Sequence, residues 1–189
     1  MKSKVSAVVV LCIISGVCAS VALAQEPTSG YRAEFLAQLT ATENKYVSLA
    51  KAVPQDKYTW RPAPGVRSIS EVYLHVAGAN YGIPNFIGTK PPASFVQKDW
   101  ETSTTDRDKI VATLKDSFAH LRKAVLALSD GDADKKVKWF GGSENTNRGV
   151  LLFFADHMGE HLGQSIAYAR VNGVVPPWTE ERQRQQQKK

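Results

Sequence analysis

The apolar positions of this chain recur at intervals of three and four over four long segments, which is the spacing of helices with one buried face. The boundaries of these segments carry the expected signals. Pro54 ends the first, Ser68-Ile69-Ser70-Glu71 forms a capping box at the start of the second, and Gly173 ends the fourth. These patterns predict helices over residues 31–53, 68–82, 105–128 and 148–172.

The connections between the segments contain little that predicts strands. Residues 137–140 alone favour an extended conformation, and they lie between the third and fourth helical segments. Four helices with at most one short strand pair predict an all-α fold, a four-helix bundle covering residues 25–178. The glutamine-rich and charged residues 179–189 predict a disordered tail after this domain.

Three of the four histidines lie on apolar faces of the predicted helices. His157 and His161 are four residues apart, which places both imidazoles on one face of the fourth helix, about 6 Å apart at Cβ. His75 lies on the apolar face of the second helix, whereas His120 is expected to face solvent on the third. Three imidazoles with one coordination position left open are a known ligand set for catalytic zinc.

The same residues allow two other interpretations. In a metal-free bundle, the buried imidazoles would need hydrogen-bond partners, which Glu71, Gln164 and Tyr168 could provide. In addition, His157-Met158-Gly159-Glu160-His161 matches the H-x-x-E-H pattern of inverzincin proteases, where the glutamate is the general base. That class also needs an acidic ligand well downstream, and the glutamates that follow lie in the predicted tail, so the motif does not indicate a peptidase.

The first residues of the chain differ from the rest in composition. Lys2 and Lys4 precede a long apolar run that ends in Ala22-Leu23-Ala24, which is the organisation of a secretory signal peptide over residues 1–24. An uncleaved membrane anchor is the alternative. We expect an exported protein, periplasmic or secreted, with no stable membrane insertion after cleavage. Both cysteines of the chain lie in this segment, so the mature protein would form no disulfide and offer no thiolate ligand.

The charge of the chain is only mildly positive. Loss of the two lysines of the signal peptide would lower the formal net charge from +6 to +4. The remaining excess is scattered along the chain and partly confined to the tail. This distribution favours solubility and indicates no binding to nucleic acid.

Several motifs, in their order along the chain, resemble the DinB superfamily. They are the stretch 60–69 (WRPAPGVRSI), His75, the pair His157-x-x-x-His161 followed by Leu162-Gly163-Gln164, and the stretch 172–178 (NGVVPPW). The resemblance implies a four-helix bundle, usually a homodimer, that binds a divalent metal through His75, His157 and His161. Zinc is the first expectation, although nitrogen ligands also suit nickel, iron or copper.

Two features depart from the pattern of this family. Leu162 stands where many relatives carry arginine, and the chain begins with an export signal whereas many relatives are cytoplasmic. Characterised relatives include metal-dependent thiol transferases and isomerases. Their thiol cofactors are mainly cytosolic reagents, so export argues against the same cofactors here.

Two functions of different classes follow from these observations. One is a metal-dependent transferase or hydrolase acting on an unknown small molecule, with Glu160 and Tyr168 in proton transfer or substrate contact. Glu71 or Gln164 would then orient an imidazole of the metal site. The alternative is a non-catalytic metal- or ligand-binding bundle, in which a fourth protein ligand closes the coordination shell.

Overall fold

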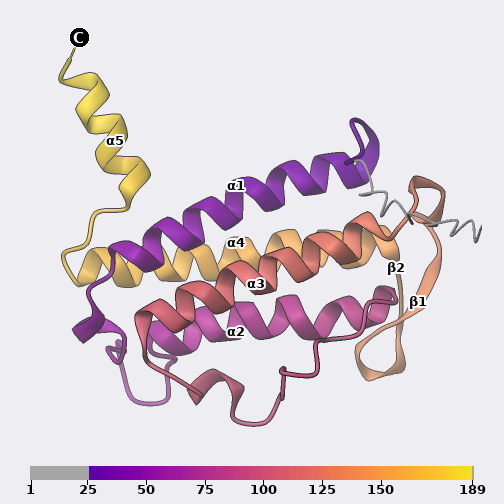
Figure 1. The fold of residues 1–189 in the computed structure, drawn as a ribbon, viewed down its shortest axis with the longest axis horizontal. Coiled ribbons are helices and arrows are strands. Elements are labelled where there is room, and N and C mark those ends of the chain that lie inside the picture. The colour runs from indigo at the N-terminus through magenta and orange to yellow at the C-terminus, as the bar shows by residue number, and fades with distance from the viewer. Residues whose placement is uncertain (1–25, 189) are drawn as a thin grey trace, which may run out of the picture.

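Four long helices form the body of the protein (Figure 1). The computed structural model describes residues 26–188, so the predicted signal peptide lies outside the described residues. The all-α bundle predicted from the sequence is confirmed, and its helix boundaries differ from the predicted ones by only one or two residues. The helices are α1 (Gly30–Ala52), α2 (Ile69–Gly82), α3 (Arg107–Leu126) and α4 (Asn147–Val171).

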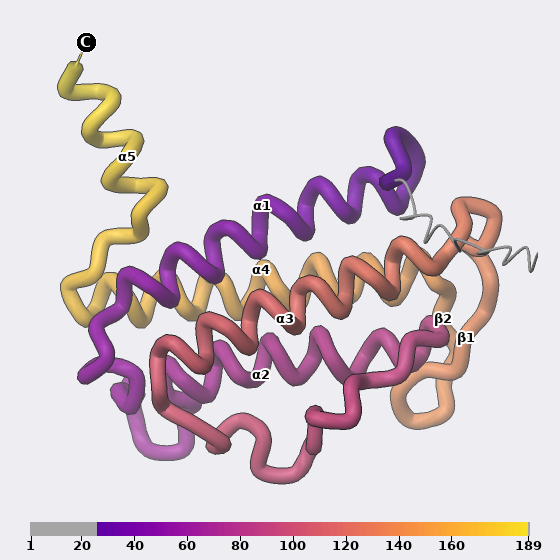
Figure 2. The backbone as a smooth tube through the Cα atoms, viewed as in Figure 1, coloured from indigo at the N-terminus to yellow at the C-terminus, as the bar shows by residue number. Residues whose placement is uncertain are grey.

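The helices α2 and α3 run in one direction, and α1 and α4 run in the other (Figure 2). Both α2 and α3 therefore begin at the same end of the bundle, and the connection 83–106 must run back along the length of the bundle between them in sequence. Both α1 and α2 pack against α3 and α4, which closes the bundle. Short 3-10 turns interrupt the connections at Gln55–Lys57, Ile83–Ile87, Trp100–Thr102, Asp130–Asp132 and Phe140–Gly142.

Side chains cap the start of three of the helices. Ser68 and Glu71 form the predicted capping box of α2: the Glu71 amide donates to Ser68 Oγ at 3.3 Å, and the Ser68 amide donates to Glu71 Oε2 at 2.8 Å. Asp106 accepts from the Lys109 amide at the start of α3, and Thr146 caps α4. These bonds satisfy amides that the helices leave without partners, so they fix where each helix begins.

The core lies between the four helices and contains one polar link that joins α1 to α4. Tyr46 is fully buried, and its hydroxyl donates to the carbonyl of Met158 at 2.8 Å, which meets the hydrogen-bonding need of a buried phenol. The largest fully buried side chains include Tyr46, Tyr58, Tyr73, Phe118, Phe154, Leu39, Leu49, Leu74, Ile110, Leu114, Leu121 and Met158. This core holds α2 and α4 in fixed positions relative to each other.

A short hairpin connects α3 to α4, as the sequence predicted. The strands β1 (Lys136–Lys138) and β2 (Glu144–Thr146) are antiparallel, with Val137 opposite Asn145. The turn between them requires two glycines, because Gly141 and Gly142 have φ angles of 66° and 81°. The hairpin presents Trp139 and Phe140 toward the same end of the bundle as the C-terminal part of α2, where both contact Phe86.

The C-terminal residues differ from the prediction of a disordered tail. They form α5 (Pro177–Gln186), which projects away from the bundle in Figure 1. The local sequence explains this helix: Pro177 occupies the first turn, Glu180 lies near the N-terminal end and Arg184 near the C-terminal end. No residue of α5 is buried. Its sequence therefore lacks the apolar spacing by which the other helices were predicted.

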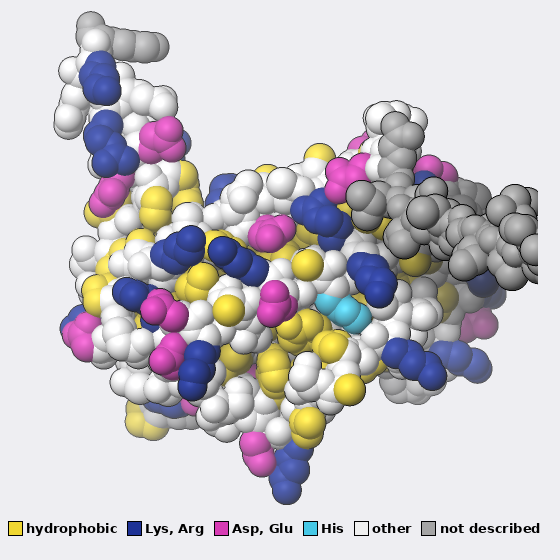
Figure 3. Space-filling model, viewed as in Figure 1, with side chains coloured by type: hydrophobic (Ala, Val, Ile, Leu, Met, Phe, Trp, Pro, Cys, Tyr) yellow, Lys and Arg dark blue, Asp and Glu magenta, His cyan; other side chains and the backbone are white. Residues whose placement is uncertain are grey.

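Within residues 26–188, no helix is both long enough and apolar enough to cross a bilayer. On the face drawn in Figure 3, basic and acidic side chains are interspersed. This distribution agrees with the scattered charge of the sequence.

Candidate metal centre

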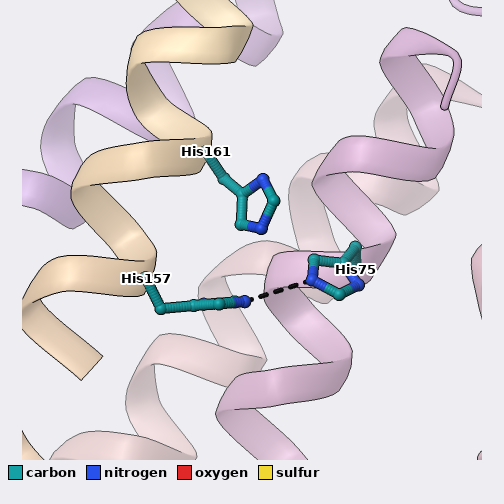
Figure 4. Close-up of side chains that lie close together, drawn as sticks. All are labelled: His75, His157 and His161. Carbon is teal, nitrogen blue, oxygen red and sulfur yellow. Dashed lines mark hydrogen bonds between the residues drawn. The ribbon is translucent and has the colours of Figure 1, made fainter. Parts of the chain in front are cut away.

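Three histidines from two neighbouring helices converge at one point of the bundle (Figure 4). His75 comes from α2, and His157 and His161 come from successive turns of α4. The Nε2 atoms of His75 and His157 are 3.1 Å apart, and the ring of His161 lies 4.6 Å from each of the other two rings. One ligand atom from each residue lies within 4.8 Å of the others.

This geometry fits a metal ion. Nitrogens bound to tetrahedral zinc at 2.0–2.1 Å lie about 3.3 Å apart, close to the His75–His157 spacing. Two neutral imidazoles that face each other through their Nε2 atoms can share only one hydrogen bond, whereas an ion would engage both lone pairs. Within residues 26–188, no cysteine, aspartate, glutamate or further histidine joins this group of ligand atoms.

The remaining nitrogen of His75 is held by a carboxylate that the sequence analysis missed. Glu101 Oε1 lies 2.7 Å from His75 Nδ1. Arg67 donates to both oxygens of Glu101, at 2.6 and 3.1 Å, and so fixes the carboxylate in turn. A carboxylate on the outer nitrogen of a ligand histidine directs the other nitrogen toward the ion and raises its basicity.

Glu101 reaches the site because the 3-10 turn Trp100–Thr102 packs against α2. Trp100 Nε1 donates to the Leu74 carbonyl at 2.7 Å, one residue before His75. Gly78 makes this approach possible, since a Cβ at that position would lie 2.9 Å from the Trp100 ring. The turn lies in a connection without apolar periodicity, so no signal in the sequence indicated its position.

A second chain of polar contacts holds His161. Its Nδ1 lies 2.9 Å from Gln164 Oε1, and Gln164 Nε2 donates to the Tyr168 hydroxyl at 2.9 Å. Trp60 packs edge-on against Tyr168, with ring centres 5.3 Å apart. Tyr168 therefore reaches His161 through Gln164, and its direct contact is with an amide rather than with the space between the three histidines.

Two other residues singled out in the sequence lie apart from the histidines. Glu71, expected to orient an imidazole, instead caps α2 and accepts a 2.8 Å bond from Arg61. Glu101, rather than Glu71, is the carboxylate that contacts the outer nitrogen of His75. Glu160, the acidic residue of the H-x-x-E-H pattern, is exposed on α4 and does not line the pocket beside the site. Of the side chains expected to orient an imidazole, Gln164 contacts one and Glu71 does not.

Burial favours the neutral, metal-binding form of two of the site histidines, His75 and His157. Desolvation lowers the pKa of His157 to about 4, with a further decrease from the positive charge that His161, His75 and Arg67 would bring. Desolvation also lowers the pKa of His75, although the hydrogen bond to Glu101 opposes it. Burial alone would raise the pKa of Glu101, but its bonds to Arg67 and His75 outweigh this effect and keep it ionised.

A pocket of about 580 Å³ opens directly beside the histidines, and both His75 and His157 line it. Its other walls come from the second half of α2, the connection after it, the tip of the hairpin and the first half of α4. The lining residues are His75, Gly78, Ala79, Gly82, Ile83, Asn85, Phe86, Gln97, Trp100, Glu101, Phe140, Phe153 and His157. A small molecule in this pocket would lie next to an ion held by the histidines.

The fourth histidine stands apart from this cluster but is not on the surface as predicted. His120 is half-buried, and its ring centre lies 5.6 Å from that of Tyr81. Desolvation lowers its pKa. The helical wheel predicted an exposed position because it takes no account of Tyr81 near the end of α2, whose ring packs against His120.

The fold and the cluster together define a four-helix-bundle protein with a three-histidine site that could hold a metal. The sequence profile of the DinB superfamily matches residues 38–165, and the chain belongs to this superfamily. The resemblance noted in the sequence is thereby confirmed.

Solved structures of DinB-like proteins share this architecture. One from Bacillus cereus ATCC 10987 is 20% identical, with a TM-score of 0.66 over 76% of this chain and 93% of its own. One from Bacillus subtilis is also 20% identical, with a TM-score of 0.60 over 75% of this chain and 93% of its own. At this identity, the likeness concerns the fold. Among curated proteins, none matches the chain.

Proposed function

We propose that this protein binds one divalent metal ion, zinc in the first place, through His75, His157 and His161, and that it uses the ion to catalyse a transfer or hydrolysis reaction on a small molecule. The observation that carries the proposal is the position of the histidines at the wall of a pocket. A buried structural site would be enclosed by protein ligands, whereas an ion at this wall could meet a molecule from the pocket.

The residues around the histidines support this role. Glu101 and Gln164 each occupy the outer nitrogen of one ligand, so that His75 and His161 are held with their other nitrogens directed inward. When bound, a divalent ion with an open position lowers the pKa of a water or thiol bound to it toward neutrality. Asn85 and Gln97 line the pocket and can orient a substrate through hydrogen bonds.

Of the two residues expected to act in proton transfer, Tyr168 and Glu160, only Tyr168 is connected to the histidines by hydrogen bonds. Tyr168 is connected to His161 through Gln164, which suits a residue that positions the ligand. Glu160 is exposed, and its carboxylate is not among the hydrogen-bond or ion-pair partners of the three histidines. In the proposed reaction, Glu160 therefore has no assigned role and Tyr168 acts through Gln164.

Export and dimer formation are further parts of the proposal. Export is inferred from the signal sequence of residues 1–24. Dimer formation follows from the resemblance to the family, and Leu152 on the outer side of α4, with 66% of its surface exposed, offers an apolar contact. Cell fractionation and light scattering of the purified protein test these two expectations separately.

The metal site is tested by the metal content of purified variants after zinc loading and gel filtration. We expect about one zinc per chain in the wild type and a large loss in His75→Ala and His157→Ala. His120→Ala is the matched control, because His120 is half-buried like the site histidines but lies outside the cluster. Equal zinc content in all four proteins would contradict the proposed ligands.

The catalytic part is tested by turnover of a panel of neutral esters and thiol adducts, with and without a chelator. Turnover that disappears with the chelator and returns with zinc supports an enzyme. Zinc binding without turnover over a wide panel would instead favour the non-catalytic alternative, in which the ion ties α2 to α4 and stabilises the bundle by mass action.

A further inference from the structure

The pocket beside the histidines has an aromatic wall that continues from the hairpin to the metal site. Phe140 and Phe153 have ring centres 6.2 Å apart, and Phe86 lies 4.9 Å from Phe140. The ring of Phe153 then stacks on that of His157, at 5.7 Å and with an angle of 21° between the planes. The wall therefore ends at a side chain that belongs to the candidate metal site.

The opposite side of the pocket is also largely apolar. Trp100 and Ile83 contribute to it, and Gly82 adds no side chain to the wall. The volume of about 580 Å³ lies in the range of pockets that enclose small organic ligands. Flat ring systems fit such walls because aromatic side chains offer stacked and edge-on contacts.

The pocket also has few charged side chains, which bears on the kind of molecule it can bind. Among the residues that line it, all of which the structure describes, there is no lysine or arginine. The only carboxylate is Glu101, which is engaged by Arg67 and His75. The polar groups left for a ligand are the amides of Asn85 and Gln97. Away from the ion that the histidines would hold, a buried anionic group would find no cation in this pocket, and burying an unpaired charge is costly.

A lysine lies outside this pocket, in an adjoining shallower hollow. That hollow has about 490 Å³ and shares Gly82, Asn85 and Gln97 with the pocket, and Lys90 lines it. Lys90 is exposed to solvent, so it would stabilise an anion only weakly. It does not change the charge of the aromatic part of the pocket.

We infer that the pocket takes a neutral, largely apolar small molecule with a flat ring, rather than an anionic thiol peptide or another acidic substrate. This inference rests on the proposed function, because the ring would be held beside the ion at His75 and His157. It names the class of substrate: a neutral aromatic compound whose reacting group lies at the histidine end of the pocket. The amides hydrogen-bond its uncharged polar groups.

The inference is tested with two probes that share a ring and differ in charge, 2-naphthalenemethanol and 2-naphthalenesulfonate. Their affinities for the purified, metal-free protein are measured by calorimetry, so that no bound ion attracts the sulfonate. We expect the neutral probe to bind at least about tenfold more tightly than the sulfonate. Equal affinities, or tighter binding of the sulfonate, would overturn the inference.

Variants of the wall show whether the probe lies in this pocket. Phe153→Ala should weaken binding of the neutral probe several-fold, whereas Val171→Ala, an exposed apolar residue of α4 outside the pocket, should not. Phe140→Ala is a second variant that leaves the core intact, since Phe140 is 50% exposed on the hairpin. Unchanged affinity in both phenylalanine variants would also overturn the inference.

The two proposals fail in different ways. If zinc does not bind but the neutral probe binds in a Phe153-dependent manner, the metal-dependent function fails while the selectivity of the pocket holds. If zinc binds with one ion per chain but the probes do not differ, the substrate class is wrong and the metal site stands.

Discussion

Glu101 lies 2.7 Å from His75 although 26 residues separate them, and this contact joins a loop to the candidate metal site. The carboxylate is held on its other side by Arg67. The three residues form a chain from the surface of the bundle to the histidine cluster, and this chain fixes which nitrogen of His75 faces the other two histidines.

Replacing Glu101 should weaken metal binding without removing a ligand. Partners of ligand histidines typically contribute about 10–100-fold to metal affinity, so we expect a loss of that size in Glu101→Ala. The dissociation constant for zinc, measured by competition with a chromophoric chelator, checks this. Glu160→Ala is the control, because Glu160 is an exposed acidic residue on α4 whose carboxylate is not among the hydrogen-bond or ion-pair partners of the histidines. Equal losses in the two variants would show that Glu101 acts only through overall charge.

Gln164 should have a similar but separate effect through His161. Gln164→Leu removes the acceptor at His161 Nδ1 and leaves the Tyr168 hydroxyl without its donor. We expect a loss of zinc affinity of roughly tenfold. Because Tyr168 lies behind Gln164, Tyr168→Phe should have a smaller effect on the same dissociation constant. A larger effect in Tyr168→Phe than in Gln164→Leu would contradict this order of contacts.

Gly78 should be needed for the approach of the loop to α2. A Cβ at this position would lie 2.9 Å from Trp100, which must then move and take Glu101 with it. Gly78→Ala should therefore lower both zinc affinity and thermal stability. The matched control is Gly163→Ala in α4, where a Cβ meets nothing within 4 Å. There alanine should stabilise the helix, by up to about 1 kcal/mol. Zinc titration and thermal unfolding of both variants measure these effects.

Glu71 should stabilise the bundle in a pH-dependent manner. Burial raises the pKa of Glu71, but hydrogen bonds from the Ser68 amide and from Arg61 outweigh this and lower it below its ordinary value of 4.5. The stabilisation is therefore present above that value and is lost as the pH falls through the lower pKa of the folded state. We expect Glu71→Gln to unfold more easily than the wild type at pH 7 and to approach it at low pH. Urea unfolding across this range checks the trend, and a difference independent of pH would contradict it.

The sequence predicted those parts of the molecule that depend on local pattern. The four helices follow from apolar spacing and capping residues, and the histidine cluster follows from the positions of His75, His157 and His161 on inward faces. The roles of Glu101 and Arg67 could not be predicted, because Glu101 lies in a connection whose path is set by Trp100 packing near Gly78. The same holds for Glu71, which was expected to orient an imidazole. The sequence indicated its capping box but not that Arg61 would donate to the second oxygen of its carboxylate.

The central claim is that three histidines hold an ion that faces the pocket. X-ray absorption at the zinc edge, measured on the zinc-loaded protein, tests it most directly. We predict one zinc with three nitrogen ligands at about 2.0–2.1 Å and a fourth, oxygen ligand that a small thiol replaces with sulfur. A zinc site closed by four protein ligands, or zinc bound with fewer than three nitrogens, would contradict the account.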